Sequence, residues 1–297
     1  GGVSAVGVDI LMSEPDRTSP AIMLDQIKKD FNVDIKRTVF PNDLLDNDRM
    51  LANVLSQVPV VMSAFVSNSS YDIPMSSLPA LRLSEIRAPG APPLAEFVPR
   101  GLGLTMPLDV LTRVSRGIGF MNAEGDVDGL FRRLPLFMVY DGKIVPGLAL
   151  ATLSLAAGGG EKMSQFVVRM DIDGPVSVKF SDITIPMSHE GSLPVLFRRK
   201  ADGNATDVYP KYSACDIIDG WVSPDSLKGK IAFVGSTVAG LKDLRPTPFD
   251  NTYPGLELHA ALVDTILSER FVTVPPWQPG AEFLLTLAVG LLAILLF

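Results

Sequence analysis

The chain has 297 residues, enough for one large α/β domain or two small ones with a sizeable core. Its net charge of −7 and pI near 4.9 argue against a nucleic-acid partner, because nucleic-acid-binding proteins present a basic face to phosphates. The only cysteine, Cys215, excludes an intramolecular disulfide. The only histidines, His189 and His259, lie far apart in sequence, so we expect neither a metal site nor a cofactor.

The first part of the chain alternates strand and helix patterns. Residues 3–12 form a near-continuous apolar run, as is typical of a strand covered on both faces of a parallel sheet. Ser19 followed by Pro20 marks a helix start, and apolar residues then recur at helical spacing. This alternation predicts crossover units and a mostly parallel central sheet flanked by helices. The predicted elements are strands over 3–12, 34–40 and 58–66, and helices starting at Ser19 and spanning 48–57.

The pattern changes twice further along the chain. Residues 68–100 are rich in Ser and Pro and lack a period, which predicts an excursion over the surface. Short alternating runs over 166–210 predict an antiparallel, β-rich elaboration. A strand over 230–234 and a helix over 254–269 then resume the α/β core.

The segment after the strand at 230–234 carries the most chemistry. A Gly-Ser-Thr sequence ends this strand, at the place where α/β sheets usually bind ligands. Gly235 allows close approach to the backbone, the hydroxyls and nearby amides can hold an anion, and Asp243 can orient His259. We therefore predict a ligand-binding or sensing site formed by Asp9, Gly235, Ser236, Thr237, Asp243 and His259.

The helix over 254–269 separates into two predicted faces. Glu257, Ala261, Asp264 and Ser268 make a mostly polar stripe, and His259 falls in the opposite apolar arc, facing the sheet. A buried imidazole requires a hydrogen-bond partner. His259 is thus either a core histidine that holds a loop in place or a group that senses a ligand or protons.

A hydrolase is a further interpretation, because Ser236, Asp243 and His259 occur in the order that α/β hydrolases use. The nucleophile elbow of those enzymes requires a second glycine two residues after the serine, and Val238 stands there. The hydrolase interpretation is therefore disfavoured.

The C-terminal run 281–297 is apolar except for Glu282 and Thr286. A bilayer core of about 30 Å requires about 20 apolar helical residues, so this run is expected to be the first part of a transmembrane helix. Trp277 suits the membrane–water interface, and Pro275, Pro276 and Pro279 give a stiff approach. The alternative is a buried C-terminal helix. We expect the chain to be a fragment with further sequence at both ends.

Several blocks resemble the second CHASE family of sensory domains. The clearest is L-K-G-K-I-A-F-V-G-S-T-V-A-G-L-K-D at 227–243, followed by T-P at 247–248 and P-G-L-E-L-H-A-A at 254–261. Earlier blocks occur in the same order, namely G-V-D-I-L-M-S-E-P-D at 7–16, D-R-M-L-A-N-V-L at 48–55 and G-F-M-N-A-E-G-D-V-D-G-L-F-R-R-L-P at 119–135. The resemblance extends to Arg270, and residues 158–209 fit it poorly.

The resemblance implies a sensory domain over 1–274, outside the plasma membrane of a bacterium, followed by transmembrane helices that begin at 281–297. A cytoplasmic nucleotide cyclase, histidine kinase or Ser/Thr kinase would follow, so this fragment itself is not expected to be an enzyme. The implied partners are the lipid bilayer, an unidentified small ligand or stimulus, and a second copy in a homodimeric receptor. A structural, non-sensing domain of a membrane protein remains the alternative, beside the hydrolase.

Overall fold

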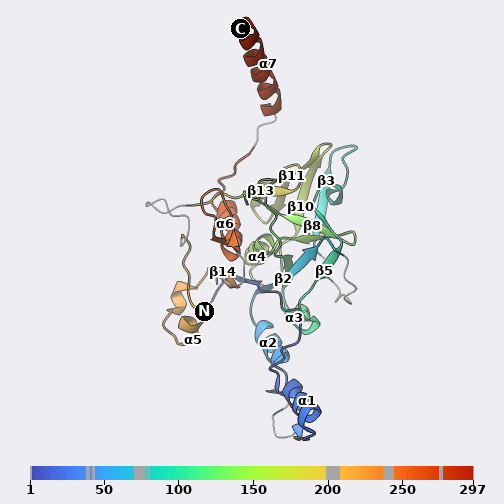
Figure 1. Cartoon of the computed structure of the whole chain (residues 1–297), viewed down its shortest axis with the longest axis vertical. Coiled ribbons are helices and arrows are strands. Elements are labelled where there is room, and N and C mark those ends of the chain that lie inside the picture. The colour runs from blue at the N-terminus through green and yellow to red at the C-terminus, as the bar shows by residue number, and fades with distance from the viewer. Residues whose placement is uncertain are drawn as a thin grey trace.

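The computed structural model describes residues 2–37, 41, 44–69, 78, 81–198, 208–236, 244–273 and 277–296. It has a mixed α/β architecture in which a central sheet lies beside a β-rich region (Figure 1). The central sheet contains β1 (Ala5–Asp9), β2 (Val60–Ser67), β5 (Gly103–Thr105), β6 (Gly117–Phe120) and β14 (Ile231–Gly235).

The central sheet is mixed rather than mostly parallel as predicted. Strands β14, β1, β2 and β6 run parallel in that order, but the last residues of β2 pair antiparallel with β5. The apolar run at 3–12 gives only five strand residues, because the chain leaves the sheet after Asp9. The sequence pattern identified these strands by their apolar content, which carries no information about the direction of a partner strand.

Helices cover both faces of this sheet, as the long apolar runs predict. Alternate residues of β2 point to opposite faces, so Met62 packs in one cluster with Ala52 and Leu111, and Val61 packs in another with Leu148. The first face is covered by α2 (Asn47–Leu55) and α3 (Asp109–Val114), and the second by α4 (Leu148–Ala157). Helix α1 (Pro20–Phe31) begins at the predicted Ser-Pro signal and lies beyond α2 (Figure 1).

Helix α4 occupies the middle of the domain. Every residue from Leu148 to Leu155 is buried, as expected for a helix that is apolar on all sides. Its other neighbour is α6 (Gly255–Leu267), and leucines of both helices belong to one large core cluster. Helix α4 therefore lies between the central sheet and the core cluster of the β-rich region.

The β-rich region confirms the antiparallel elaboration predicted for 166–210. Strands β10 (Phe166–Asp171), β11 (Gly174–Phe180) and β12 (Ile183–Pro186) form an antiparallel meander. Phe166 packs edge-to-face against Phe137 and Phe180 at its centre. The smaller strands are β4 (Arg100–Gly101), β7 (Arg133–Pro135), β8 (Phe137–Tyr140), β9 (Lys143–Pro146), β13 (Ser192–Pro194), β15 (Leu244–Arg245) and β16 (Tyr253–Pro254).

Two expectations from the sequence were wrong in their described parts. Residues 34–37 form no strand. The segment 68–100 is more than a surface excursion, because β3 (Leu83–Arg87) pairs parallel with β10 and extends that sheet. Short elements complete the chain, namely η3 (Leu94–Glu96), α5 (Ala214–Ile218) and η4 (Pro224–Ser226).

The C-terminal run forms α7 (Gln278–Leu296), which stands away from the rest of the chain at the end opposite to α1 (Figure 1). Its large apolar side chains, from Phe283 to Ile294, are each at least 50% exposed. Within the described residues, no helix combines the length and the apolar character that crossing a membrane requires.

Candidate functional site

Asp9 and Gly235 lie side by side at the carboxyl edge of the central sheet. They are register partners at the ends of the parallel strands β1 and β14. A Cβ atom on Gly235 would lie 2.9 Å from Cδ1 of Leu256 and 3.3 Å from Cβ of Asp9. Only glycine therefore lets α6 and Asp9 approach this strand end so closely.

His259 comes to the same place from α6. Its imidazole is 5% exposed and stacks on Phe233 of β14, with ring centroids 5.8 Å apart. Its Nε2 atom lies 3.7 Å from Oδ1 of Asp9, whose side chain is 4% exposed. This separation is too long for a direct hydrogen bond, and Oδ1 of Asp9 has no hydrogen-bond partner in the described part of the chain.

The arrangement brings together Asp9, Gly235 and His259 from three elements. Ser236 follows directly at the end of β14. Thr237 and Asp243 lie outside the described residues, so the predicted pairing of Asp243 with His259 stays a prediction. The prediction that His259 faces the sheet is confirmed by its burial against Phe233. A buried carboxylate and a buried imidazole at this distance can both hydrogen-bond to a polar ligand atom placed between them.

The predicted polar stripe of α6 is not a solvent-facing stripe. Ala261 is fully buried and Glu257 is 4% exposed, whereas Leu267, assigned to the apolar arc, is 57% exposed. The reason is that α6 packs against α4, β14 and β16, and Leu196, after β13, donates its N–H to Thr265 of α6, so more than one face is covered. An isolated helical pattern cannot show a second covering element.

Sequence reasoning missed two acid–base groupings on this stripe. The buried carboxylate of Glu257 pairs with Nζ of Lys211 at 2.6 Å. Two turns further along α6, the guanidinium of Arg198 donates two hydrogen bonds to the carboxylate of Asp264. The Tyr209 hydroxyl donates to the same carboxylate at 3.3 Å. Burial, and then the negative charge of Asp264, raise the pKa of Tyr209 above its ordinary value.

The available signal was the spacing of Glu257 and Asp264 on one stripe of the helix. Their partners are Arg198, Tyr209 and Lys211, of which Arg198 and Tyr209 belong to 158–209, the region that fits the family pattern poorly. These ion pairs attach that region to α6.

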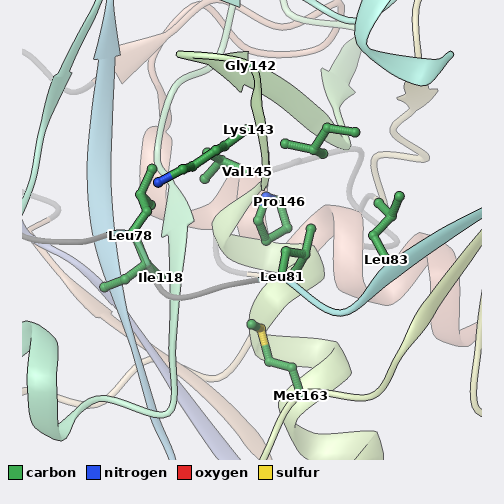
Figure 2. Close-up of a pocket in the computed structure, with 10 residues that line it drawn as sticks. Leu78, Leu81, Leu83, Ile118, Gly142, Lys143, Val145, Pro146 and Met163 are labelled. Carbon is green, nitrogen blue, oxygen red and sulfur yellow. The ribbon is translucent and has the colours of Figure 1, made fainter.

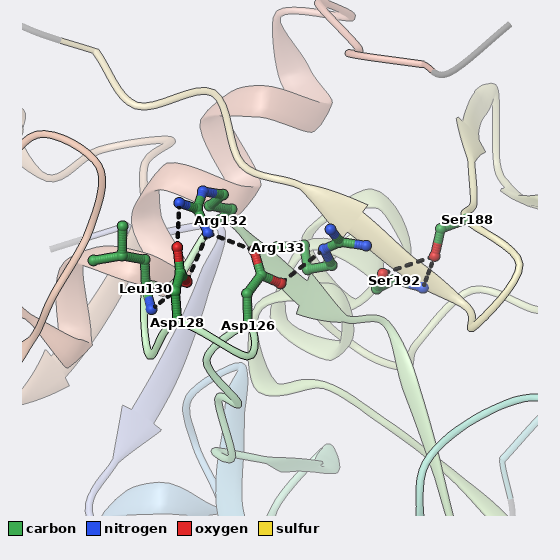
Figure 3. Close-up of polar contacts among 7 residues, drawn as sticks. All are labelled: Asp126, Asp128, Leu130, Arg132, Arg133, Ser188 and Ser192. Atoms are coloured by element: carbon green, nitrogen blue, oxygen red, sulfur yellow. Dashed lines mark hydrogen bonds and ion pairs between the residues drawn. The ribbon is translucent and has the colours of Figure 1, made fainter. Parts of the chain in front are cut away.

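A third polar cluster fixes the loop between β6 and β7 (Figure 3). Arg132 donates to Asp126 at 3.0 Å and to Asp128 at 2.9 and 2.7 Å, and Arg133 lies 3.1 Å from Asp126. The hydrogen bonds from Arg132, and then the N–H of Leu130, lower the pKa of Asp128 to about 2. Each of the four charged side chains has a partner of opposite charge within the cluster, which favours a structural role for it. Nearby, Ser188 and Ser192 join in a tight turn.

Asn122 ties the same loop to the central sheet. Its side-chain oxygen accepts the N–H of Val66 at 2.8 Å, and its side-chain nitrogen donates to the carbonyl of Val66 at 2.6 Å. The side-chain amide of Asn122 thus makes the two hydrogen bonds to Val66 that the backbone of a neighbouring strand would otherwise make.

Comparison with known proteins gives one match. The family model described as the CHASE2 domain matches residues 1–295, which confirms the resemblance seen in the sequence blocks. Neither a curated protein nor a solved structure matches the chain. Among the described residues, no three His, Cys, Asp or Glu side chains gather in a way that could hold a metal ion.

Proposed function

Because the chain belongs to the CHASE2 family of extracytoplasmic sensory domains, we propose that it is the input of a membrane receptor. The receptor would relay a stimulus to a cytoplasmic nucleotide cyclase or protein kinase. We place the sensing site at the carboxyl edge of the central sheet, where Asp9, Gly235 and His259 meet and where Ser236, Thr237 and Asp243 follow in the chain. The observation that carries this proposal is the buried Asp9–His259 pair, in which Oδ1 of Asp9 lacks a hydrogen-bond partner among the described residues.

The position of α6 supports a mechanical role for this site. Leu256 contacts the strand end at Gly235, and His259, three residues later on the same helix, faces Asp9. A ligand or proton that alters the Asp9–His259 pair would therefore act on the first turns of α6. Such a stimulus shifts α6 only if it binds one arrangement of the helix better than the other.

The chain order gives the path of the signal. Only residues 268–277 separate the end of α6 from the start of α7. The apolar side chains exposed along α7 would favour lipid over water, and we propose that α7 is the first part of a transmembrane helix. A homodimeric receptor in a bacterial plasma membrane, with residues 1–274 outside, follows from the same proposal.

The family is sensory rather than catalytic, and the sequence after β14 favours the same conclusion. Val238 also stands where the nucleophile elbow of an α/β hydrolase requires a second glycine. We therefore do not retain the hydrolase interpretation.

The sensing site is tested with Asp9→Asn in the full-length receptor. Asn keeps the size of the side chain and removes its charge, so we expect changed basal output and a changed response to the stimulus. Asp173→Asn, in an exposed turn, is the matched control and should behave as the wild type. A folded Asp9→Asn receptor with unchanged basal and stimulated output would refute the sensing role.

The relay is tested separately by replacing Pro275 and Pro276 of the connecting segment, together with Pro279 in the first turn of α7, with Gly and Ser. Proline fixes φ near −65°, so the replacement should weaken coupling between stimulus and output while the domain keeps its stability. An unchanged response would mean that the segment is only a tether.

The topology is tested with Cys215, which is exposed and is the only cysteine. An impermeant thiol reagent should label it on intact cells, and Cys215→Ser should abolish that labelling. Protection until the cells are broken would place the domain inside.

A further inference from the structure

An apolar cavity lies at the edge of the central sheet, away from the Asp9–His259 site (Figure 2). Its volume is about 390 Å³, within the range of pockets that bind small molecules. The wall residues come from β3, β6, β9 and the segment between α4 and β10; they include Leu83, Ile118, Lys143, Val145, Pro146 and Met163.

Among the described residues that line the cavity, Lys143 is the only ionisable one. The turn before it, Asp141–Gly142, has positive φ at both positions, as two-residue hairpin turns require. Lys143 and Val145 are two residues apart in β9, so both face the same side of the strand. Figure 2 shows the Lys143 side chain extending across the cavity wall toward Leu78. Within the described part of the chain, its ammonium has neither an ion pair nor a hydrogen bond.

Apolar walls with one cation at the rim define the chemistry of a ligand. We propose that this cavity binds a small apolar molecule carrying one carboxylate, which pairs with the Lys143 ammonium. One lysine matches a single negative charge, whereas a phosphate dianion would call for further donors. At about 30 Å³ for each water-sized group, the cavity accommodates at most about 13 non-hydrogen atoms, which is the size of a medium-chain fatty acid.

Met163 makes the floor of the cavity adjustable. A Cβ on Gly117 would lie 2.9 Å from Sδ of Met163, so Gly117→Ala must displace this flexible side chain. The backbone of Gly117 does not require positive φ, so alanine is compatible with the strand. This variant changes the shape of the cavity without changing its charge.

The inference goes beyond the proposed function, because it concerns a second site and its test is binding rather than signalling. The whole chain is reconstituted in lipid nanodiscs and photolabelled with a diazirine derivative of decanoic acid, and the labelled peptides are mapped. We expect label on peptides that contain Ile118, Val145 or Met163, displaced by decanoate and not by decanol. Label confined to α7 and unaffected by decanoate would overturn the proposal.

Variants separate charge from shape. Lys143→Met keeps the aliphatic stem, and loss of the ion pair of this exposed lysine should raise the half-saturating concentration about 2- to 5-fold. Lys143→Arg should bind as the wild type does. Lys179→Met, an exposed strand lysine outside the cavity, is the matched control and should also bind normally. Gly117→Ala should weaken labelling of the same peptides, with circular dichroism showing that each variant is folded. Equal binding by Lys143→Met and the wild type would refute the role of the charge.

Discussion

The close contact between Gly235 and Leu256 should couple the end of β14 to α6 energetically, and substitutions at the two positions can measure this coupling. In Gly235→Ala, the new Cβ would lie 2.9 Å from Cδ1 of Leu256 and 3.3 Å from Cβ of Asp9. Carbon atoms prefer a separation of about 3.5–4.0 Å, so the leucine must move by roughly 0.6–1.1 Å or change rotamer. Overpacking of this kind costs about 1–3 kcal/mol, and we expect about 1–2 kcal/mol because Leu256 is only partly buried.

The expected cost is measurable by denaturant unfolding and by heat. A loss of about 1–2 kcal/mol corresponds to a Tm lower by about 2–8 °C in a domain of this size. Leu256→Ala removes the atom that the new methyl group would meet. Gly235→Ala should therefore cost clearly less in the Leu256→Ala background, with a coupling energy of about 1 kcal/mol.

Additive costs would refute this reasoning. If Gly235→Ala destabilises both backgrounds equally, within about 0.5 kcal/mol, the strain does not pass through Leu256. The proposed path from the strand end to α6 would then lose its first contact. In the full-length receptor, the same pair of variants should show whether relief of the strain also restores basal output.

Three further predictions concern the polar clusters. Lys211→Met leaves the buried Glu257 carboxylate without this partner and should lower the free energy of unfolding by about 1–3 kcal/mol, measured with denaturant. Adding Glu257→Gln should recover part of this loss, and an unchanged free energy in Lys211→Met would contradict the pairing. Asn122→Ala leaves a buried backbone N–H and carbonyl of β2 unpaired, and unfolding should show a loss of about 2 kcal/mol, whereas an unchanged midpoint would show that the loop is held otherwise. Asp128 should titrate by NMR at about 2, and Arg132→Met should raise that pKa. Because the folded-state pKa lies below the ordinary value, the stability from this carboxylate is present above about pH 4 and is lost as the pH falls toward 2; an Asp128 titration that Arg132→Met leaves unchanged would refute the assignment.

The sequence by itself determined many of the local elements and the side of α6 on which His259 lies. Apolar runs located β1, β2 and β14, and helical spacing located α2 and α6 close to their observed bounds. The position of His259 on the apolar side of α6 predicted its burial, which the structure confirms. These features depend on periodicity and on residues at element ends, which are properties of short stretches of chain. The ordered blocks also sufficed for the family assignment.

Only the tertiary structure decided which distant groups meet. The antiparallel β5, the burial of Glu257 beneath Lys211, and the cavity beside Lys143 each join segments that are far apart in the chain. The sequence pattern placed Glu257 on a polar stripe because a charged residue in an isolated helix is most stable facing water. A nearby lysine compensates part of the cost of burying it, and no local pattern contains that lysine. Strand direction and burial of polar groups thus follow from long-range packing, whereas element type and the apolar face follow from the local sequence.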